Sequence, residues 1–129
     1  MSAHQQLTQN IKNYARELGF TAVGMSKAQY LEEDAPNLEE WLKRNYHGEM
    51  QYMQNHFDIR LDPRKLVDGA KSVISLSYNY YTAQTQNSSA PKLSKYAYGE
   101  DYHVVIKDKL KQLLQYIQQQ TGTINARVF

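Results

Sequence analysis

The stretch Tyr-Ala-Tyr-Gly-Glu-Asp-Tyr-His, residues 96–103, joins a polar loop to an amphipathic segment. It places three tyrosines, two acidic residues, one glycine and one histidine in eight positions. Gly99 allows a turn that side chains would hinder. Asp101 or Glu100 is placed to accept hydrogen bonds from the first N–H groups of a helix. The stretch therefore predicts a helix start surrounded by hydrogen-bonding side chains.

The helix that follows is predicted from residues spaced three or four apart on one face, which are His103 and the apolar residues Ile106, Leu110, Leu113 and Ile117. We expect His103 on the buried side of this helix, in the first turn, where that side leaves the core. The positive end of the helix dipole disfavours an imidazolium there. A neutral ring would donate from one nitrogen and accept at the other. The alternative is a histidine that only borders the core.

The composition indicates one globular domain. The chain has 129 residues, of which 41% are hydrophobic, and no cysteine. The absence of cysteine excludes disulfides, thiolate metal sites and a cysteine nucleophile within this chain. No apolar run is long enough to span a bilayer, and the N-terminus does not resemble a secretion signal. We therefore expect a cytoplasmic protein.

The charge is unevenly distributed. Residues 1–59 carry five basic and eight acidic side chains, whereas residues 60–129 carry ten basic and five acidic ones. The basic half contains the stretch 96–103, which allows an anionic partner such as a phosphate-bearing cofactor or nucleic acid. An ordinary solvated surface would give the same imbalance.

The first half of the chain predicts a helix, a strand and a second helix. Residues 7–18 have helical spacing that Gly19 ends. Residues 20–26 are expected to form an interior strand, because neither of its faces is strongly polar. A helix is expected over residues 37–45, after an acidic run.

The segment around His47 and His56 carries no pattern of metal ligands. The two histidines are too far apart for a helical metal pair, and no acidic partner completes a set, so no metal site is predicted. Met50 and Met53 are expected to form one short helical turn that packs on the core.

Arg60 is the candidate anion-binding residue of the segment 58–66. Asp62 and Pro63 are typical of the start of a helical turn. Arg60 is expected just outside that turn, with a planar donor group suited to phosphate, carboxamide or carboxylate. The alternative is a surface ion pair with Asp58 or Asp62.

The second half of the chain predicts strands and a loop. Residues 72–81 alternate between an apolar face and a small polar face, which is either solvent-exposed or the wall of a polar ligand site. Residues 82–90 are expected to form a mobile loop. Residues 93–96 and 124–129 are expected to form further strands. Because the chain stops within the last of these, we expect it to be a piece of a longer protein.

Five motifs occur together and in order. They are Tyr-His-Gly-Glu-Met-Gln-Tyr-Met (46–53), Arg-Leu-Asp-Pro-Arg-Lys-Leu (60–66), Ala-Lys-Ser-Val-Ile-Ser (70–75), Asn-Tyr-Tyr (79–81) and Lys-Tyr-Ala-Tyr-Gly-Glu-Asp-Tyr-His (95–103). With these motifs the chain resembles the N-terminal domain of the epoxyqueuosine reductases over nearly its whole length. Each motif alone is weak, but five in register are specific.

The resemblance implies a fold and an activity. The fold would be an α/β (α+β) sandwich with a mixed sheet flanked by helices, similar to nitroreductases, cobalamin-processing proteins and reductive dehalogenases. The activity would be reduction of epoxyqueuosine to queuosine at the wobble position of tRNA, with cobalamin and two 4Fe-4S clusters. Residues 1–129 would form a cobalamin-binding N-terminal domain, followed by a ferredoxin-like domain and helical repeats. The full-length protein would be a monomer with tRNA as its substrate.

The resemblance also assigns roles to four residues. Arg60 and Ser94 would contact cobalamin, and Tyr102 and His103 would face the modified base. The family's proposed proton donor, an aspartate, and the cysteines of the clusters would lie beyond Phe129. This chain alone is therefore expected to be inactive.

Two other functions stay open on the sequence. One is a flavin-dependent, nitroreductase-like oxidoreductase, which bound yellow flavin would favour. The other is a non-catalytic tRNA-binding module. Against the latter, the chain has no dense Lys/Arg face and no glycine-rich RNA-binding signature.

Overall fold

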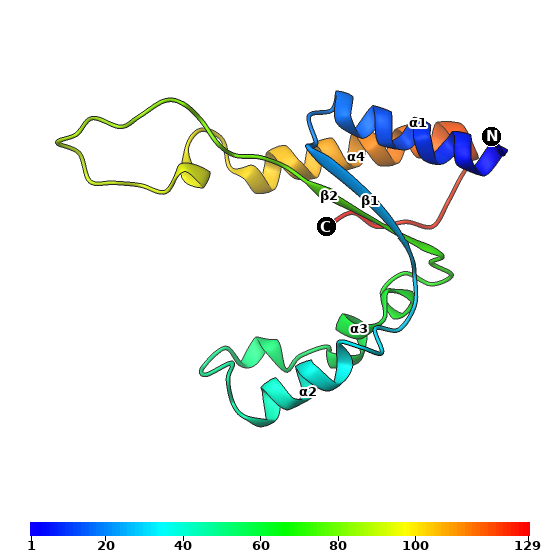
Figure 1. Ribbon diagram of the computed structural model, residues 1–129, viewed down its shortest axis with the longest axis horizontal. Helices are drawn as coiled ribbons and strands as arrows, with labels where there is room; N and C mark the ends of the chain where they lie inside the picture. Colours follow the sequence, from blue (N-terminus) through cyan, green and yellow to red (C-terminus); the bar gives the residue numbers. More distant parts are fainter. The chain divides into compact units, whose positions relative to one another are not determined.

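A computed structural model describes residues 1–129 (Figure 1). Its elements are, in chain order, α1 (Ala3–Glu17), β1 (Ala22–Lys27), α2 (Ala35–Lys43), α3 (Phe57–Leu61), β2 (Ser72–Ser77) and α4 (Tyr102–Thr121), with short 3₁₀ helices η1 (Gln51–Met53), η2 (Pro63–Lys65) and η3 (Lys95–Ala97). The chain forms two compact units, one of residues Met1–Gly24 and Ser75–Phe129 and one of residues Met25–Ile74. None of the helices is both long and apolar enough to cross a membrane.

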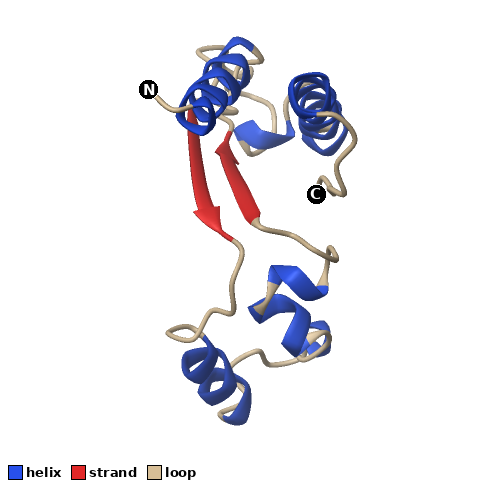
Figure 2. Cartoon of the chain, turned by 90° about the vertical axis from the view of Figure 1, so that its right-hand side faces the viewer, coloured by secondary structure: helices blue, strands red, loops and turns tan.

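The sheet consists of β1 and β2, which lie side by side in Figure 2. Backbone bonds join Thr21 to Ser77 and Ala28 to Lys71, so the strands are antiparallel. The α+β class is thus confirmed, but a mixed sheet is not what this chain forms. The strand predicted at residues 20–26 is present as β1, but its predicted interior position was wrong. Each strand has one neighbour only, and β1 is exposed or half-buried along its length.

The faces of β2 follow the predicted alternation. Ile74, Leu76 and Tyr78 are half-buried, whereas the small polar residues between them are exposed. The small polar face is therefore the solvent-exposed side of the strand in this structure. The strand ends at Ser77, four residues earlier than predicted.

Helix α1 packs against α4 in the first unit (Figure 1). A capping box between Ser2 and Gln5 begins α1, and Gly19 follows its end at a φ of 101°, as its sequence pattern predicted. The rings of Tyr14 and Tyr116 stack between the two helices, with centroids 4.2 Å apart. The buried apolar residues of this unit are Ile11, Ala15, Phe20 and Leu113.

Helix α4 begins where the sequence predicted. Asp101 is its N-cap, and the carboxylate accepts a hydrogen bond from the backbone N–H of His103. The predicted inner residues Ile106, Leu110, Leu113 and Ile117 are all buried or half-buried. Gly122 follows the last turn, as expected.

The second unit is built around short helices. Helix α2 begins two residues earlier than predicted, after Asp34, whose side chain makes no capping bond. Asp62 caps η2 through the N–H of Arg64 and also accepts two hydrogen bonds from the Arg64 guanidinium, at 2.9 and 2.8 Å. These bonds lower the pKa of the Asp62 carboxyl, whose side chain is only 8% exposed. The helical turn predicted at Asp62 and Pro63 is confirmed.

His47 lies in the interior of this unit with 1% of its surface exposed. Its Nε2 is 2.7 Å from the amide nitrogen of Gln54, and its Nδ1 has no hydrogen-bond partner. The predicted turn at residues 50–53 is present as η1, but Met50 is exposed rather than packed on the core.

Two predicted strands are absent. The expected strand at residues 93–96 does not form, because its last two residues begin the 3₁₀ helix η3. Residues 124–129 adopt no regular structure. An isolated strand leaves its backbone groups unpaired, and no other strand lies beside either segment. Beyond Gly122 the guanidinium of Arg127 instead packs over the ring of Phe129, 4.9 Å from its centroid.

Candidate functional site

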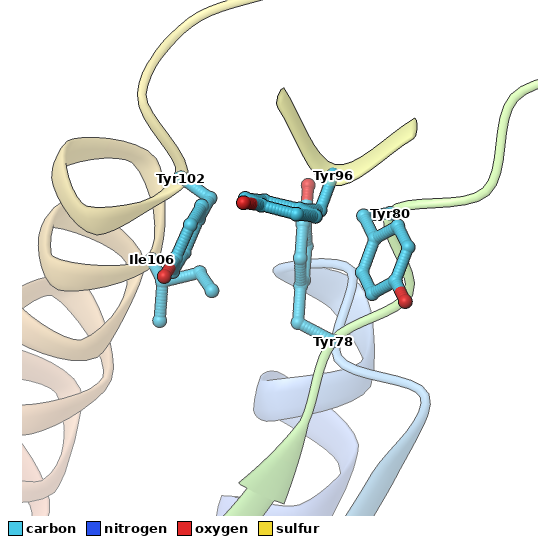
Figure 3. A pocket seen from close by; sticks show the side chains of 5 residues that line it. All are labelled: Tyr78, Tyr80, Tyr96, Tyr102 and Ile106. Carbon is cyan, nitrogen blue, oxygen red and sulfur yellow. The ribbon is translucent and has the colours of Figure 1, made fainter. Parts of the chain in front are cut away.

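Tyrosines from three parts of the first unit surround one cavity (Figure 3). Tyr78 and Tyr80 follow β2, Tyr96 lies in η3, and Tyr102 and Ile106 belong to the first two turns of α4. The cavity has a volume of about 380 Å³. That volume is at the small end of the range for small-molecule sites, which are lined mainly by apolar and aromatic groups with a few polar ones.

The cavity walls are held by edge-to-face contacts between rings. Tyr96 lies at the centre, with ring centroids 6.3 Å from Tyr80 and 6.0 Å from Tyr102 and interplanar angles of 80° in both pairs. This is a favoured geometry for aromatic pairs, because the positive edge of one ring meets the negative face of the other. Tyr80, Tyr96 and Tyr102 are all partly exposed, so the cavity is reached from the surface. It offers flat apolar walls with phenol hydroxyls.

The structure places only one of the two residues predicted to act together at the cavity. Tyr102 lines the cavity, but His103 does not. His103 is 72% exposed, so the expectation that it lies on the buried side of α4 was wrong. The imidazole is drawn instead toward Asp101 and stacks on Tyr102, with centroids 4.0 Å apart and an interplanar angle of 28°.

Asp101 binds His103 twice through one oxygen. Its Oδ1 accepts from the backbone N–H of His103 at 2.9 Å and lies 2.8 Å from Nδ1 of the imidazole. These two hydrogen bonds lower the pKa of the Asp101 carboxyl below its usual range. The carboxylate is therefore ionised at neutral pH and favours a proton on Nδ1. The prediction that the ring is neutral stays a prediction.

Lys95 holds the two ends of the polar segment 82–95 together. Its ammonium donates to the carbonyl oxygen of Thr82 at 2.8 Å and lies 4.2 Å from the ring centroid of Tyr81. Lys95 thus joins the two ends of the segment 82–95. Ser94 is exposed at the N-cap of η3, and its hydroxyl makes no capping bond. It remains free to contact a ligand.

Arg60, in the second unit, is occupied by the protein itself. It lies outside the turn that Asp62 and Pro63 begin, as predicted, and belongs to the preceding helix α3. There its Nε donates to the Asn55 carbonyl at 2.9 Å and its Nη2 to the Tyr52 carbonyl at 3.0 Å. It pairs with neither Asp58 nor Asp62, so the alternative of a surface ion pair was wrong. Two donors of its planar group stabilise the turn at residues 52–55. Elsewhere in the chain, no group of three His, Asp or Glu side chains is placed to hold a metal ion.

Residues 60–129 match a family model described as epoxyqueuosine reductase QueG, DUF1730. The matched segment is more than half of the chain, and it contains every residue that lines the cavity. The chain belongs to the epoxyqueuosine reductase QueG family. The family resemblance inferred from the five motifs is therefore confirmed.

Curated relatives match the chain over nearly its whole length. An epoxyqueuosine reductase of Leadbetterella byssophila is 61% identical over 95% of the chain, and one of Cyclobacterium marinum is 56% identical over 100%. The Escherichia coli epoxyqueuosine reductase is 42% identical over 96%. The chain spans about two fifths of the first two relatives, 40% and 42% of their lengths.

A solved structure has the same fold. The epoxyqueuosine reductase of Streptococcus thermophilus superposes with a TM-score of 0.75 over 90% of this chain and 32% of that one, at 24% sequence identity. At this identity the similarity supports the fold of this QueG-family chain and nothing finer.

Sequence reasoning missed most of the cavity. It selected Tyr102 from the family motif but not Tyr78, Tyr80, Tyr96 or Ile106. The signal was present in the pairing of Tyr78 and Tyr80 on one predicted face of the strand and in the tyrosines of the stretch 96–103. What the pattern could not supply was that these two segments meet.

Proposed function

We propose that the intact protein reduces epoxyqueuosine to queuosine at the wobble position of tRNA. The observation that carries this proposal is the family match over residues 60–129, the segment that supplies the whole tyrosine cavity. The names of the curated relatives agree with it. The chain would contribute the N-terminal part of a cytoplasmic, monomeric enzyme.

The family resemblance also implies cobalamin and two 4Fe-4S clusters. A cobalamin molecule is far larger than the ligands that a cavity of about 380 Å³ encloses, so the cavity fits only part of it or the modified base. Flat tyrosine faces and the free hydroxyl of Ser94 suit the edge of a macrocycle. Bound cobalamin would supply cobalt in a low oxidation state as the nucleophile or reductant. Arg60 would contact cobalamin through the guanidinium N–H groups that are not bound to the carbonyls of Asn55 and Tyr52.

Tyr102 is the residue of this chain best placed to assist the chemistry. When an epoxide opens, negative charge develops on the departing oxygen, which must be stabilised and protonated. The phenol of Tyr102 lies at the cavity wall and can donate a hydrogen bond to that oxygen. His103 would assist Tyr102 through the stacking contact between their rings. The resemblance assigns the proton donor itself to an aspartate beyond Phe129.

The test is turnover of the intact enzyme on epoxyqueuosine-containing tRNA, with queuosine measured in the digested nucleosides. We expect Tyr102→Phe to lower turnover about 100-fold and His103→Ala to lower it as well, with the bound corrin spectrum retained in both. The matched control is Tyr81→Phe, which removes a hydroxyl from a tyrosine outside the cavity. Wild-type turnover in both site variants would reject these roles.

The wild-type protein also separates the remaining alternatives. We include in this proposal that the intact protein has a nitroreductase-like fold. The sheet of this chain has two strands and does not by itself define such a fold. A corrin absorption spectrum after reconstitution is the expected result. Bound flavin would support a flavin enzyme instead, and tRNA binding without any turnover would support a binding module.

A further inference from the structure

The Asp101 carboxylate has a second partner besides the helix that it caps. An N-cap needs only one oxygen that accepts from a backbone N–H of the first turn. Here the same oxygen also lies 2.8 Å from Nδ1 of His103. A carboxylate can only accept, so Nδ1 carries the proton of this hydrogen bond. The other ring nitrogen, Nε2, has no partner within the chain.

The imidazole fixed in this way touches a wall of the cavity. Its ring lies nearly parallel to that of Tyr102 at a centroid separation of 4.0 Å. Tyr102 in turn meets Tyr96 edge to face at 6.0 Å. A continuous set of contacts therefore runs from the carboxylate, through the imidazole, to two rings that line the cavity.

We propose that Asp101 is a positioning residue, which holds His103 in its Nδ1-protonated form and so sets the imidazole against Tyr102 at the cavity wall. In this arrangement His103 acts on the site through its ring, since it does not itself line the cavity. A displacement of a reacting group by about 1 Å can lower a rate roughly 100-fold, so the orientation of Tyr102 matters. The catalytic consequence rests on the proposed function, whereas the tautomer and the stack do not.

Two substitutions separate positioning from capping. Serine and asparagine both cap helices as well as aspartate does. Asp101→Ser keeps an acceptor for the backbone but is too short to reach the imidazole. Asp101→Asn keeps an oxygen that can accept from Nδ1. Both variants should retain the helix signal in circular dichroism, and only Asp101→Ser should release the imidazole.

The first measurement is the tautomer of His103, from long-range ¹H–¹⁵N spectra of the intact protein labelled at histidine. The signal is assigned by its loss in His103→Gln. We expect proton attachment mainly at Nδ1 in the wild type and in Asp101→Asn, and a shift toward Nε2 in Asp101→Ser. The same tautomer distribution in wild type and Asp101→Ser would overturn the proposal, whatever the enzyme does to tRNA.

The second measurement is turnover on epoxyqueuosine-containing tRNA. His103→Phe keeps a flat ring on Tyr102 without exchangeable protons, and His103→Ala removes the ring. We expect His103→Phe to exceed His103→Ala by roughly tenfold, and Asp101→Asn to exceed Asp101→Ser. Equal loss in both His103 variants would overturn the role of the stack, and wild-type turnover in Asp101→Ser would overturn the positioning role. If the wild type has no reductase activity, the proposed function fails while the tautomer result stands.

Discussion

The ammonium of Lys109 donates a hydrogen bond of 2.6 Å to the carbonyl oxygen of Leu18, which is the C-cap residue of α1. The same ammonium lies 5.6 Å from the ring centroid of Tyr78, a wall of the cavity. Lys109 thus connects the negative end of one helix to the body of another. One lysine of α4 secures both the packing of the unit and one side of the site.

Lys109→Met should therefore destabilise the fold. It keeps the apolar stem but leaves a partly buried carbonyl without its charged donor, so we expect the free energy of unfolding to fall by about 1–2 kcal/mol. Urea denaturation followed by circular dichroism measures this change. The control Lys107→Met alters an exposed lysine of the same helix and should change stability by less than about 0.5 kcal/mol. Equal effects would contradict the role of the bond.

Leu113 is the apolar residue by which α4 is anchored in the core, with 3% of its surface exposed. Leu113→Ala removes buried methyl groups and leaves a cavity, which should cost about 2–4 kcal/mol of unfolding free energy. The neighbouring Gln112→Ala changes an exposed position and should be nearly neutral. A loss below about 1 kcal/mol in Leu113→Ala would mean that the helix packs loosely there.

The lowered pKa of Asp62 predicts a dependence of stability on pH. A carboxylate whose pKa is lower in the folded state stabilises the fold fully above its unfolded pKa, about 3.9, and loses that contribution as the pH falls through the folded value. Asp62→Asn keeps the capping oxygen but cannot ionise. The stability gap between wild type and Asp62→Asn should be constant from about pH 7 to 5 and shrink below about pH 4.

The matched comparison for Asp62 is Asp58→Asn, which alters an exposed carboxyl that pairs with no basic side chain. Urea denaturation at four pH values gives the difference in unfolding free energy between the wild type and each variant. If the gap for Asp62 does not narrow in acid, or narrows equally for Asp58, the ion pair with Arg64 is not the cause.

Arg60 gives a prediction that combines structure and cofactor. Arg60→Ala frees the carbonyl groups of Tyr52 and Asn55, so amide hydrogen exchange in residues 50–56 should accelerate. In the intact enzyme we also expect weaker retention of cobalamin. Arg60→Lys keeps the charge but not the planar group, so it should show the same two effects in weaker form. Unchanged corrin absorbance after gel filtration of both variants would contradict the proposed contact.

The sequence predicted those elements whose signal is local. The cap at Asp101, the apolar spacing up to Ile117 and the glycines after α1 and α4 each depend on a few neighbouring residues, and all were found. Strand predictions fared worse, because a strand exists only with a partner. Residues 124–129 have suitable side chains for a strand and no neighbour, so no strand forms.

The site was predicted in part for the same reason. The stretch 96–103 indicated a cluster of tyrosines. The contact between Tyr80 and Tyr96, however, depends on the path of the loop that joins them, which no sequence periodicity determines. His103 matched the apolar spacing and still left the core, because the carboxylate two residues earlier competes for the imidazole. A hydrogen bond to the N-cap carboxylate can therefore keep a first-turn side chain out of the core even where the apolar spacing predicts burial.

The chain has a single tryptophan, Trp41, which lies in the unit of residues 25–74 with its ring centroid 5.6 Å from that of the buried His47. Light at 295 nm excites this indole and not the eleven tyrosines. Its fluorescence therefore follows the unfolding of one unit alone. Tyrosine absorbance mainly follows the unit that holds the cavity, because eight of the eleven tyrosines lie there. Two optical signals from the unlabelled chain can thus establish whether both units melt together.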